Sequence, residues 1–209
     1  RGAEDLPDRE EKNGPARMML AVEGGAVLGG KLDRLQDLAE LGVRLITLTW
    51  NGPNELGNGC TSGSEEGLTP LGKEAIRRME SLGILPDVSH LNEAGFWDVA
   101  EMANGPFVAT HSVSAAVHPH PRNLTDAQFR TIRDRGGLVG LNLCADHLGE
   151  QSFEQLERHW EHYLSLGGES TVAFGCDWDG TDLPEDWQGI AVMERLYAYF
   201  LRRNYSQDW

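Results

Sequence analysis

The sequence predicts an α/β fold in which parallel strands form a barrel and helices cover its outside. Strand-like apolar runs alternate along the chain with longer segments of helical periodicity, which is typical of βα units. In addition, an acidic or imidazole side chain directly follows four of these runs; the four are Glu23, His90, His111 and Asp177. Because the C-terminal ends of parallel barrel strands converge on one face, we expect these side chains to meet there.

The elements are expected in strict alternation. Strand-like runs cover residues 18–22, 44–50, 84–89, 106–110, 137–143 and 171–176. Apolar residues at helical spacing predict helices over 31–41, 70–79, 92–102, 125–135, 152–166 and 189–204. Thr69 with Pro70, and the capping box from Thr125 to Gln128, mark two of the helix starts. The segment 51–70 is rich in Gly and Asn and is expected to be a loop over the active face.

One domain is expected after a short tail. Residues 1–17 are polar and contain Pro and Gly, which predicts a loop or tail, and residues 18–209 are expected to form a partial (β/α)8 (TIM) barrel catalytic domain. A complete barrel needs eight strands and about 250 residues. A chain of 209 residues with six strands is two strands short, so the first strands are expected to be missing from it.

Charge and composition exclude several classes of partner. The formal net charge is −15, which argues against binding nucleic acid or an anionic membrane surface. No apolar run approaches the roughly 20 residues that cross a bilayer, so no membrane segment is expected in this chain. Cys60, Cys144 and Cys176 form no C-x-x-C arrangement, which favours reduced thiols and a cytoplasmic location.

Seven short motifs stand in collinear order from about residue 18 onward. They are Val22–Gly25, Gly42–Thr49, Gly67–Gly72, Asp87–His90, Thr110–Ser112, Pro121–Leu124 and Phe174–Gly180. Together they resemble the membrane dipeptidase (renal dipeptidase) family of zinc peptidases. The resemblance implies an amidohydrolase-type (β/α)8 barrel with two zinc ions, which hydrolyses dipeptides, including some with a D-residue at the C-terminal side. It also implies a homodimer.

The resemblance implies a role for each matching residue. Glu23 is the carboxylate that bridges the two zincs, and His90 and His111 bind the second zinc. Asp177 acts on the water at the zinc and is counted with Glu23 as catalytic, whereas Arg122 holds the carboxylate of the substrate. These roles agree with the chemistry, because zinc binds imidazole nitrogen and carboxylate oxygen, and a guanidinium pairs bidentately with a carboxylate.

The sequence also departs from the family pattern. The family's first strand carries a His-x-Asp pair that binds the first zinc, but every histidine here lies at or after His90, so that ligand pair is absent from this chain. Trp50 stands at a strand end where animal members have a histidine, and Trp50 and Asn51 are expected to line the substrate pocket. Asp179 competes with Asp177, but the match favours Asp177.

Three functional hypotheses follow from these observations. The leading one is a zinc-dependent dipeptidase. The second is a related amidohydrolase that acts on a lactam, lactone or phosphoester, and Arg122 separates the two because only a dipeptide needs its carboxylate held. The third is a non-catalytic remnant of the family, suggested by the absent His-x-Asp pair and by Trp50.

Overall fold

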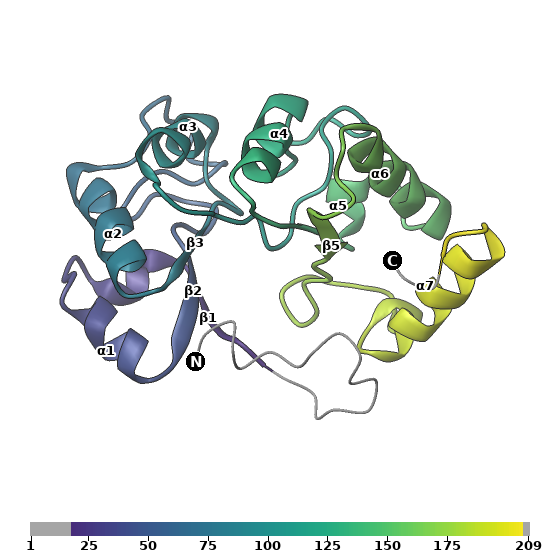
Figure 1. Cartoon of the computed structure of the whole chain (residues 1–209), viewed down its shortest axis with the longest axis horizontal. Helices are drawn as coiled ribbons and strands as arrows, with labels where there is room; N and C mark the ends of the chain where they lie inside the picture. The colour runs from purple at the N-terminus through teal and green to yellow at the C-terminus, as the bar shows by residue number, and fades with distance from the viewer. Residues whose placement is uncertain (1–17, 207–209) are drawn as a thin grey trace.

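The computed structural model describes residues 18–206, which adopt an α/β fold whose elements follow one another around an arc (Figure 1). The predicted tail over residues 1–17 lies outside this range. The strands are β1 (Leu20–Glu23), β2 (Val43–Thr47), β3 (Leu85–Asp87), β4 (Val139–Leu141) and β5 (Val172–Phe174). The α-helices are α1 (Arg34–Glu40), α2 (Pro70–Ser81), α3 (Glu93–Met102), α4 (Asp126–Asp134), α5 (Ala145–Leu148), α6 (Phe153–Ser165) and α7 (Ala191–Arg202), and the 3-10 helices are η2 (Gly25–Leu28) and η3 (Glu185–Trp187).

All strand pairing is parallel, as the alternating pattern predicts. Strands β1, β2 and β3 form one sheet in that order, and β4 pairs with β5 in a second sheet. The segment 106–110 is not the strand that the sequence predicts; it contributes only the isolated bridges Asp87↔Val108 and Ala109↔Val139. These bridges join the two sheets into one parallel run, but residues 18–206 form short sheets rather than a closed barrel.

The side chain of Asp87 limits the pairing between β3 and the segment 106–110. Its Oδ1 atom accepts hydrogen bonds from the backbone N–H groups of Ser89 and Thr110, each at 3.0 Å. A side chain that captures backbone donors competes with the ladder that those donors would extend. The N–H groups of Ser89 and Thr110 are thereby withheld from the ladders that flank β3.

The helix starts agree with the capping residues in the sequence. Thr69 accepts a hydrogen bond from the Gly72 N–H at the start of α2, and Thr125 and Gln128 form the expected capping box of α4. Such caps satisfy backbone donors that have no partner inside the helix, and each contributes about 1 kcal/mol. Helix α1 begins three residues after the predicted Lys31, and the short helix α5 was not predicted.

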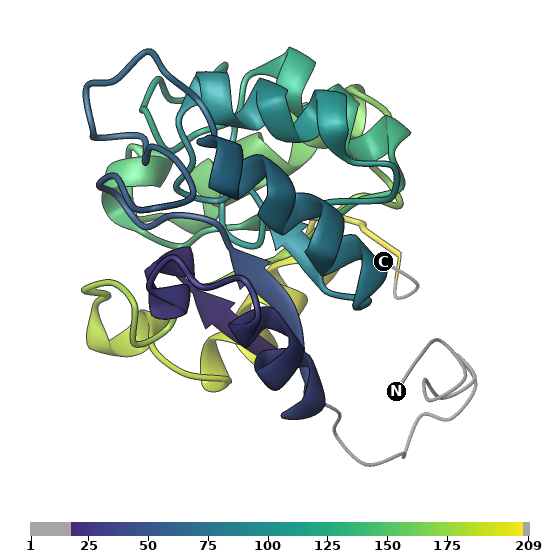
Figure 2. The same ribbon diagram turned by 90° about the vertical axis from the view of Figure 1, so that its left-hand side faces the viewer.

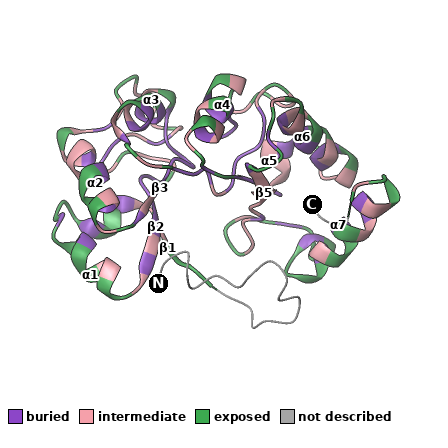
Figure 3. Ribbon diagram, viewed as in Figure 1, coloured by how far each residue is buried: buried purple, intermediate pink, exposed green. Residues whose placement is uncertain are grey.

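The helices pack on the strands through one continuous apolar core. In Figure 2, α2 and α3 lie alongside each other, and α2 also packs on β3. Buried residues gather on the inner sides of the helices (Figure 3), and the rings of Phe129 in α4 and Tyr163 in α6 stack with centroids 4.0 Å apart. Within residues 18–206, no helix is long and apolar enough to cross a membrane.

Candidate metal centre

The strand register brings the predicted site residues to one edge of the sheet. Glu23, the last residue of β1, pairs with Thr47 of β2, which pairs in turn with Asp87 of β3. His90 and His111 follow shortly after β3 and after the Ala109 bridge. Because all these strands are parallel, their C-terminal ends lie at the same edge, and the structure brings Glu23, His90 and His111 together as the sequence predicts.

The three side chains point their ligand atoms at one another. Oε1 of Glu23 lies 2.9 Å from Nε2 of His90 and 3.2 Å from Nε2 of His111, and the two Nε2 atoms are 2.8 Å apart. Both imidazoles are buried, whereas the Glu23 side chain keeps 43% of its surface exposed. The site is therefore fixed on the imidazole side and accessible to solvent on the carboxylate side.

The surroundings favour the charge states that bind a metal. The neighbouring imidazoles of His111 and then His90 hold the pKa of the Glu23 carboxyl far below its usual range, so this group is an anion. Burial lowers the pKa of His90, which favours the neutral ring. An anionic carboxylate and neutral imidazoles are the states in which these groups donate lone pairs to a cation.

Hydrogen bonds on the far side of each ring support the same conclusion. Nδ1 of His90 lies 2.8 Å from Oδ1 of Asn51, and Nδ1 of His111 lies 2.8 Å from Oγ1 of Thr110. An amide oxygen can only accept, so His90 carries its proton on Nδ1 and has a lone pair on Nε2. The Nε2 lone pair of His90 and the Glu23 carboxylate then lie within hydrogen-bond distance of each other, an arrangement that fits a metal cation.

Two of the site residues have strained backbones. His90 has φ 68° and Asp177 has φ 58°, in the left-handed region that non-glycine residues rarely adopt. Each such residue costs on the order of 1–3 kcal/mol and persists only where the surroundings enforce it. The His90 carbonyl accepts a 2.7 Å hydrogen bond from the Cys60 N–H, which ties the loop after β2 to this conformation. Of the four described non-glycine residues with positive φ, His90 and Asp177 are thus predicted site residues.

Arg122 lies beside the centre, and its guanidinium is buried there. The side chain is buried, its Nη2 donates to the backbone oxygen of His111 at 3.3 Å, and its Nε has no hydrogen-bond partner among the described residues. Burial lowers its pKa, while the acidic groups Asp87, Asp177 and Glu23 act in the opposite direction. A buried donor without a partner costs free energy that an anionic ligand can recover.

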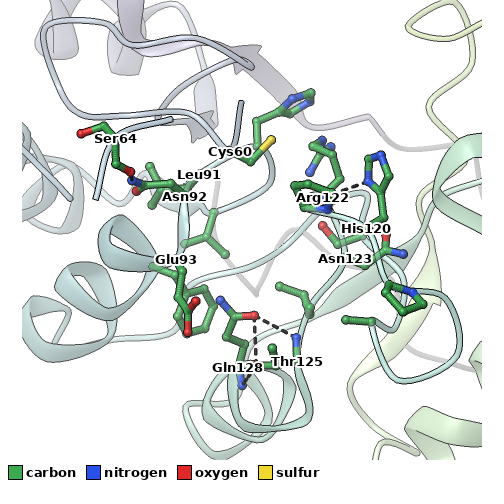
Figure 4. Close-up of a pocket in the computed structure, with 18 residues that line it drawn as sticks. Cys60, Ser64, Leu91, Asn92, Glu93, His120, Arg122, Asn123, Thr125 and Gln128 are labelled. Carbon is green, nitrogen blue, oxygen red and sulfur yellow. Dashed lines mark hydrogen bonds between the residues drawn. The ribbon is translucent and has the colours of Figure 1, made fainter. Parts of the chain in front are cut away.

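A cavity of about 620 Å³ adjoins this guanidinium and is lined by both Arg122 and His90. Figure 4 shows Arg122 and His120 on one side of the cavity and Asn92 and Glu93 on the other. Such a volume is in the range that accommodates small-molecule ligands. A small ligand in this cavity would lie between a buried cation and the imidazole side of the candidate metal centre.

The remaining predicted residues lie around the centre. Asp177 stands outside the cluster of ligand atoms, and its Oδ2 accepts a 3.2 Å hydrogen bond from Nδ2 of Asn142. Trp50 is 60% exposed, and its ring centroid lies 6.2 Å from that of His90. Asn51, expected as a polar contact for the substrate, uses its side-chain oxygen to hold His90.

Sequence reasoning gave no role to several polar residues that support the site. Asn142 holds Asp177, and the side chains of Thr47, Asp87 and Thr110 form a hydrogen-bonded network behind His111. The available signal was the position of Asp87 at the end of an apolar run, three residues before His90. A carboxylate that ends a buried strand requires several donors, and the neighbouring threonines could supply them.

Comparisons with known proteins agree with this geometry. The sequence profile of the membrane dipeptidase family (peptidase family M19) matches residues 2–208. The chain belongs to the membrane dipeptidase family. It is 39% identical over 203 residues to an uncharacterized protein in the pqqA 5′ region of Klebsiella pneumoniae, covering 91% of this chain and 75% of that protein.

Two solved structures of family members superpose well on this chain. One is a metallo peptidase from Rhodobacter sphaeroides liganded with a phosphinate mimic of the dipeptide L-Ala-D-Ala, with TM-score 0.84, 36% identity, and coverage of 91% of this chain and 58% of that chain. The other is the metallo peptidase dipeptidase AC, with TM-score 0.85, 36% identity, and coverage of 91% and 60%. This chain thus spans about three fifths of the length of these peptidases.

Proposed function

We propose that the protein is a zinc-dependent dipeptidase that hydrolyses dipeptides, including some with a D-residue at the C-terminal side. The observation that carries this proposal is the convergence of Glu23, His90 and His111, whose ligand atoms all lie within 4.8 Å of one another. One carboxylate and two imidazoles suit zinc. The dipeptide mimic bound by the relative from Rhodobacter sphaeroides supports the choice of substrate.

Each site residue is proposed to have its own role in hydrolysis. Bound zinc would lower the pKa of a water molecule and polarise the scissile carbonyl. Glu23, His90 and His111 would hold the metal, and the second carboxylate oxygen of Glu23 would be available to a further ion. Asp177 is held through Oδ2 by Asn142 and has Oδ1 to accept the proton of the attacking water.

Arg122 positions the substrate. Its buried guanidinium lies beside the cavity of about 620 Å³, and its Nε, which has no hydrogen-bond partner within residues 18–206, can bind the C-terminal carboxylate of a dipeptide there. A carboxylate held at this point restricts productive binding to peptides that end one residue beyond the scissile bond. Trp50, exposed near His90, supplies an apolar wall on the other side of the site.

The arc of βα units is proposed to be part of a (β/α)8 barrel of the amidohydrolase type. The parallel pairing of every strand, the bridges that join the two sheets and the likeness to the two solved peptidases support this architecture. In such a barrel, further strands pair with β1 and β5 and bring additional ligands to the same face. Two zincs per site is then the expected stoichiometry.

The proposal is tested by dipeptide hydrolysis with L- and D-residues at the C-terminal position. Hydrolysis is expected with zinc, and it is expected to be lost after chelation and in Glu23→Gln and His111→Ala. His162→Ala is the matched control, because this imidazole binds Asp126 away from the centre. If Glu23→Gln and His111→Ala hydrolyse dipeptides as fast as the unaltered protein, the proposed function is wrong.

Arg122→Ala separates a dipeptidase from a hydrolase of lactones or phosphoesters. Hydrogen bonds to charged groups contribute about 1.5–3 kcal/mol, so KM for dipeptides is expected to rise about tenfold to a hundredfold. Hydrolysis of an activated ester without a carboxylate is expected to change much less. An equal loss on both substrates would argue against the carboxylate-binding role of Arg122.

A further inference from the structure

The most completely hydrogen-bonded carboxylate near the centre is not one of the proposed metal ligands. Asp87 is fully buried at the end of β3, and four donors surround it. The hydroxyls of Thr47 and Thr110 each donate to Oδ2 at 2.6 Å, and the N–H groups of Ser89 and Thr110 donate to Oδ1. All four contacts come from donors, so Asp87 acts purely as an acceptor.

This arrangement determines how the Thr110 hydroxyl can bind its other neighbours. A hydroxyl has one proton and two lone pairs. Its proton is committed to Asp87, so its lone pairs face Nδ1 of His111 at 2.8 Å and Oγ of Ser89 at 3.3 Å. Nδ1 of His111 must then carry the proton and donate it to Thr110. The lone pair of the neutral imidazole is left on Nε2, the atom that faces Glu23.

We infer that Asp87 and Thr110 are positioning residues, which fix the tautomer and orientation of His111 for metal binding. They act through a hydrogen-bond chain that runs from the Asp87 carboxylate through the Thr110 hydroxyl to His111 Nδ1. This inference rests on the proposed function, because it assumes a metal held by His111. Partners on the far side of a metal-ligating histidine commonly change metal affinity about tenfold to a hundredfold. Here a neutral hydroxyl stands between the carboxylate and the imidazole.

The chain offers a matched control for this inference. Thr47 and Thr110 donate to the same oxygen of Asp87 at the same 2.6 Å distance, but only Thr110 also contacts His111. Thr47→Val and Thr110→Val therefore remove equivalent hydrogen bonds from Asp87. Only Thr110→Val also removes the acceptor of the His111 Nδ1–H. Thr110→Ser restores that acceptor.

Asp87→Asn tests the other end of this hydrogen-bond chain. A carboxylate offers an acceptor to each of the four donors, whereas an amide has to point its NH2 group at two of them. If the NH2 group faces Thr110, the hydroxyl proton becomes available to His111 Nδ1 and favours the tautomer that cannot bind metal through Nε2. Metal binding is expected to weaken at least as much as in Thr110→Val.

Zinc affinity of the metal-free protein, measured by competition with a chromophoric chelator, is the main readout. Thr110→Val is expected to bind zinc about tenfold to a hundredfold more weakly, with Thr47→Val and Thr110→Ser within about threefold of the unaltered protein. In the zinc-loaded protein, NMR should show a slowly exchanging His111 Nδ1–H proton that Thr110→Val loses and Thr47→Val keeps.

Two results would overturn the inference while the proposed function stands. One is unaltered zinc affinity and a protected Nδ1–H proton in Thr110→Val. The other is an equal loss of affinity in Thr47→Val and Thr110→Val, which would assign the network a structural role only. If the unaltered protein itself binds no zinc, the proposed function fails first.

Discussion

Mild acid is expected to destabilise the protein through His159, a buried histidine of α6. This side chain has no exposed surface. Its Nδ1 accepts a 3.1 Å hydrogen bond from the Ser114 N–H, and its Nε2 lies 3.1 Å from the backbone oxygen of Leu148. His159 thus joins the loop after His111 to helix α5. Protonation adds a proton at Nδ1, where the Ser114 N–H already points.

The structure gives the size and direction of this effect. Burial lowers the pKa of His159 from 6.5 to about 4. A histidine with a lowered pKa binds fewer protons in the folded state, so its contribution to stability is complete above pH 6.5 and is lost as the pH falls toward 4. At about 1.4 kcal/mol per pKa unit, the total is about 3 kcal/mol. About 2 kcal/mol of it is lost between pH 7.5 and pH 5.

Urea unfolding at pH 7.5 and pH 5 measures this loss. His159→Gln is the variant to compare, because its amide can donate to Leu148 without titrating. The free energy of unfolding of the unaltered protein is expected to fall about 2 kcal/mol further than that of His159→Gln over this interval. Parallel pH dependence in the two proteins would refute the assignment of the acid sensitivity to His159.

Two further substitutions test the packing behind the site. Gly175→Ala would place a Cβ 1.8 Å from the Thr110 carbonyl oxygen. Urea unfolding is therefore expected to show a loss of stability of about 2 kcal/mol or more. Gly52→Ala is the control and should change stability little, because the space around its Cβ is open. Equal unfolding midpoints for the two variants would contradict this packing. Tyr163→Phe removes a buried hydroxyl that has no partner among the described residues and keeps the ring stacked on Phe129. Thermal unfolding of this variant is therefore expected at the same or a higher temperature. A large decrease in the unfolding temperature would show that the hydroxyl is hydrogen-bonded.

The positions of the site residues could be predicted from the sequence because topology alone brings them together. Glu23, His90 and His111 each follow an apolar run, and the C-terminal ends of parallel strands share one edge. Strand lengths could not be predicted in the same way. The segment 106–110 has the composition of a strand, but the Asp87 carboxylate captures the Thr110 N–H that a longer ladder would use.

The hydrogen-bond partners of the site were beyond sequence reasoning for a similar reason. Asn51 was expected to contact the substrate, but its side chain turns toward His90, a residue 39 positions later in the chain. Thr47 and Thr110 resemble ordinary strand residues in the sequence, and only the register of β2, β3 and the segment 106–110 reveals that they share one carboxylate. Such contacts depend on distances between side chains that no local pattern encodes.

The most direct test of the account is the zinc content of the purified protein, measured per chain by elemental analysis beside Glu23→Gln, His111→Ala and the control His162→Ala. The account predicts bound zinc in the unaltered protein and the control, and less zinc in the other two. Zinc contents that do not differ among the four proteins would contradict a metal centre formed by Glu23, His90 and His111.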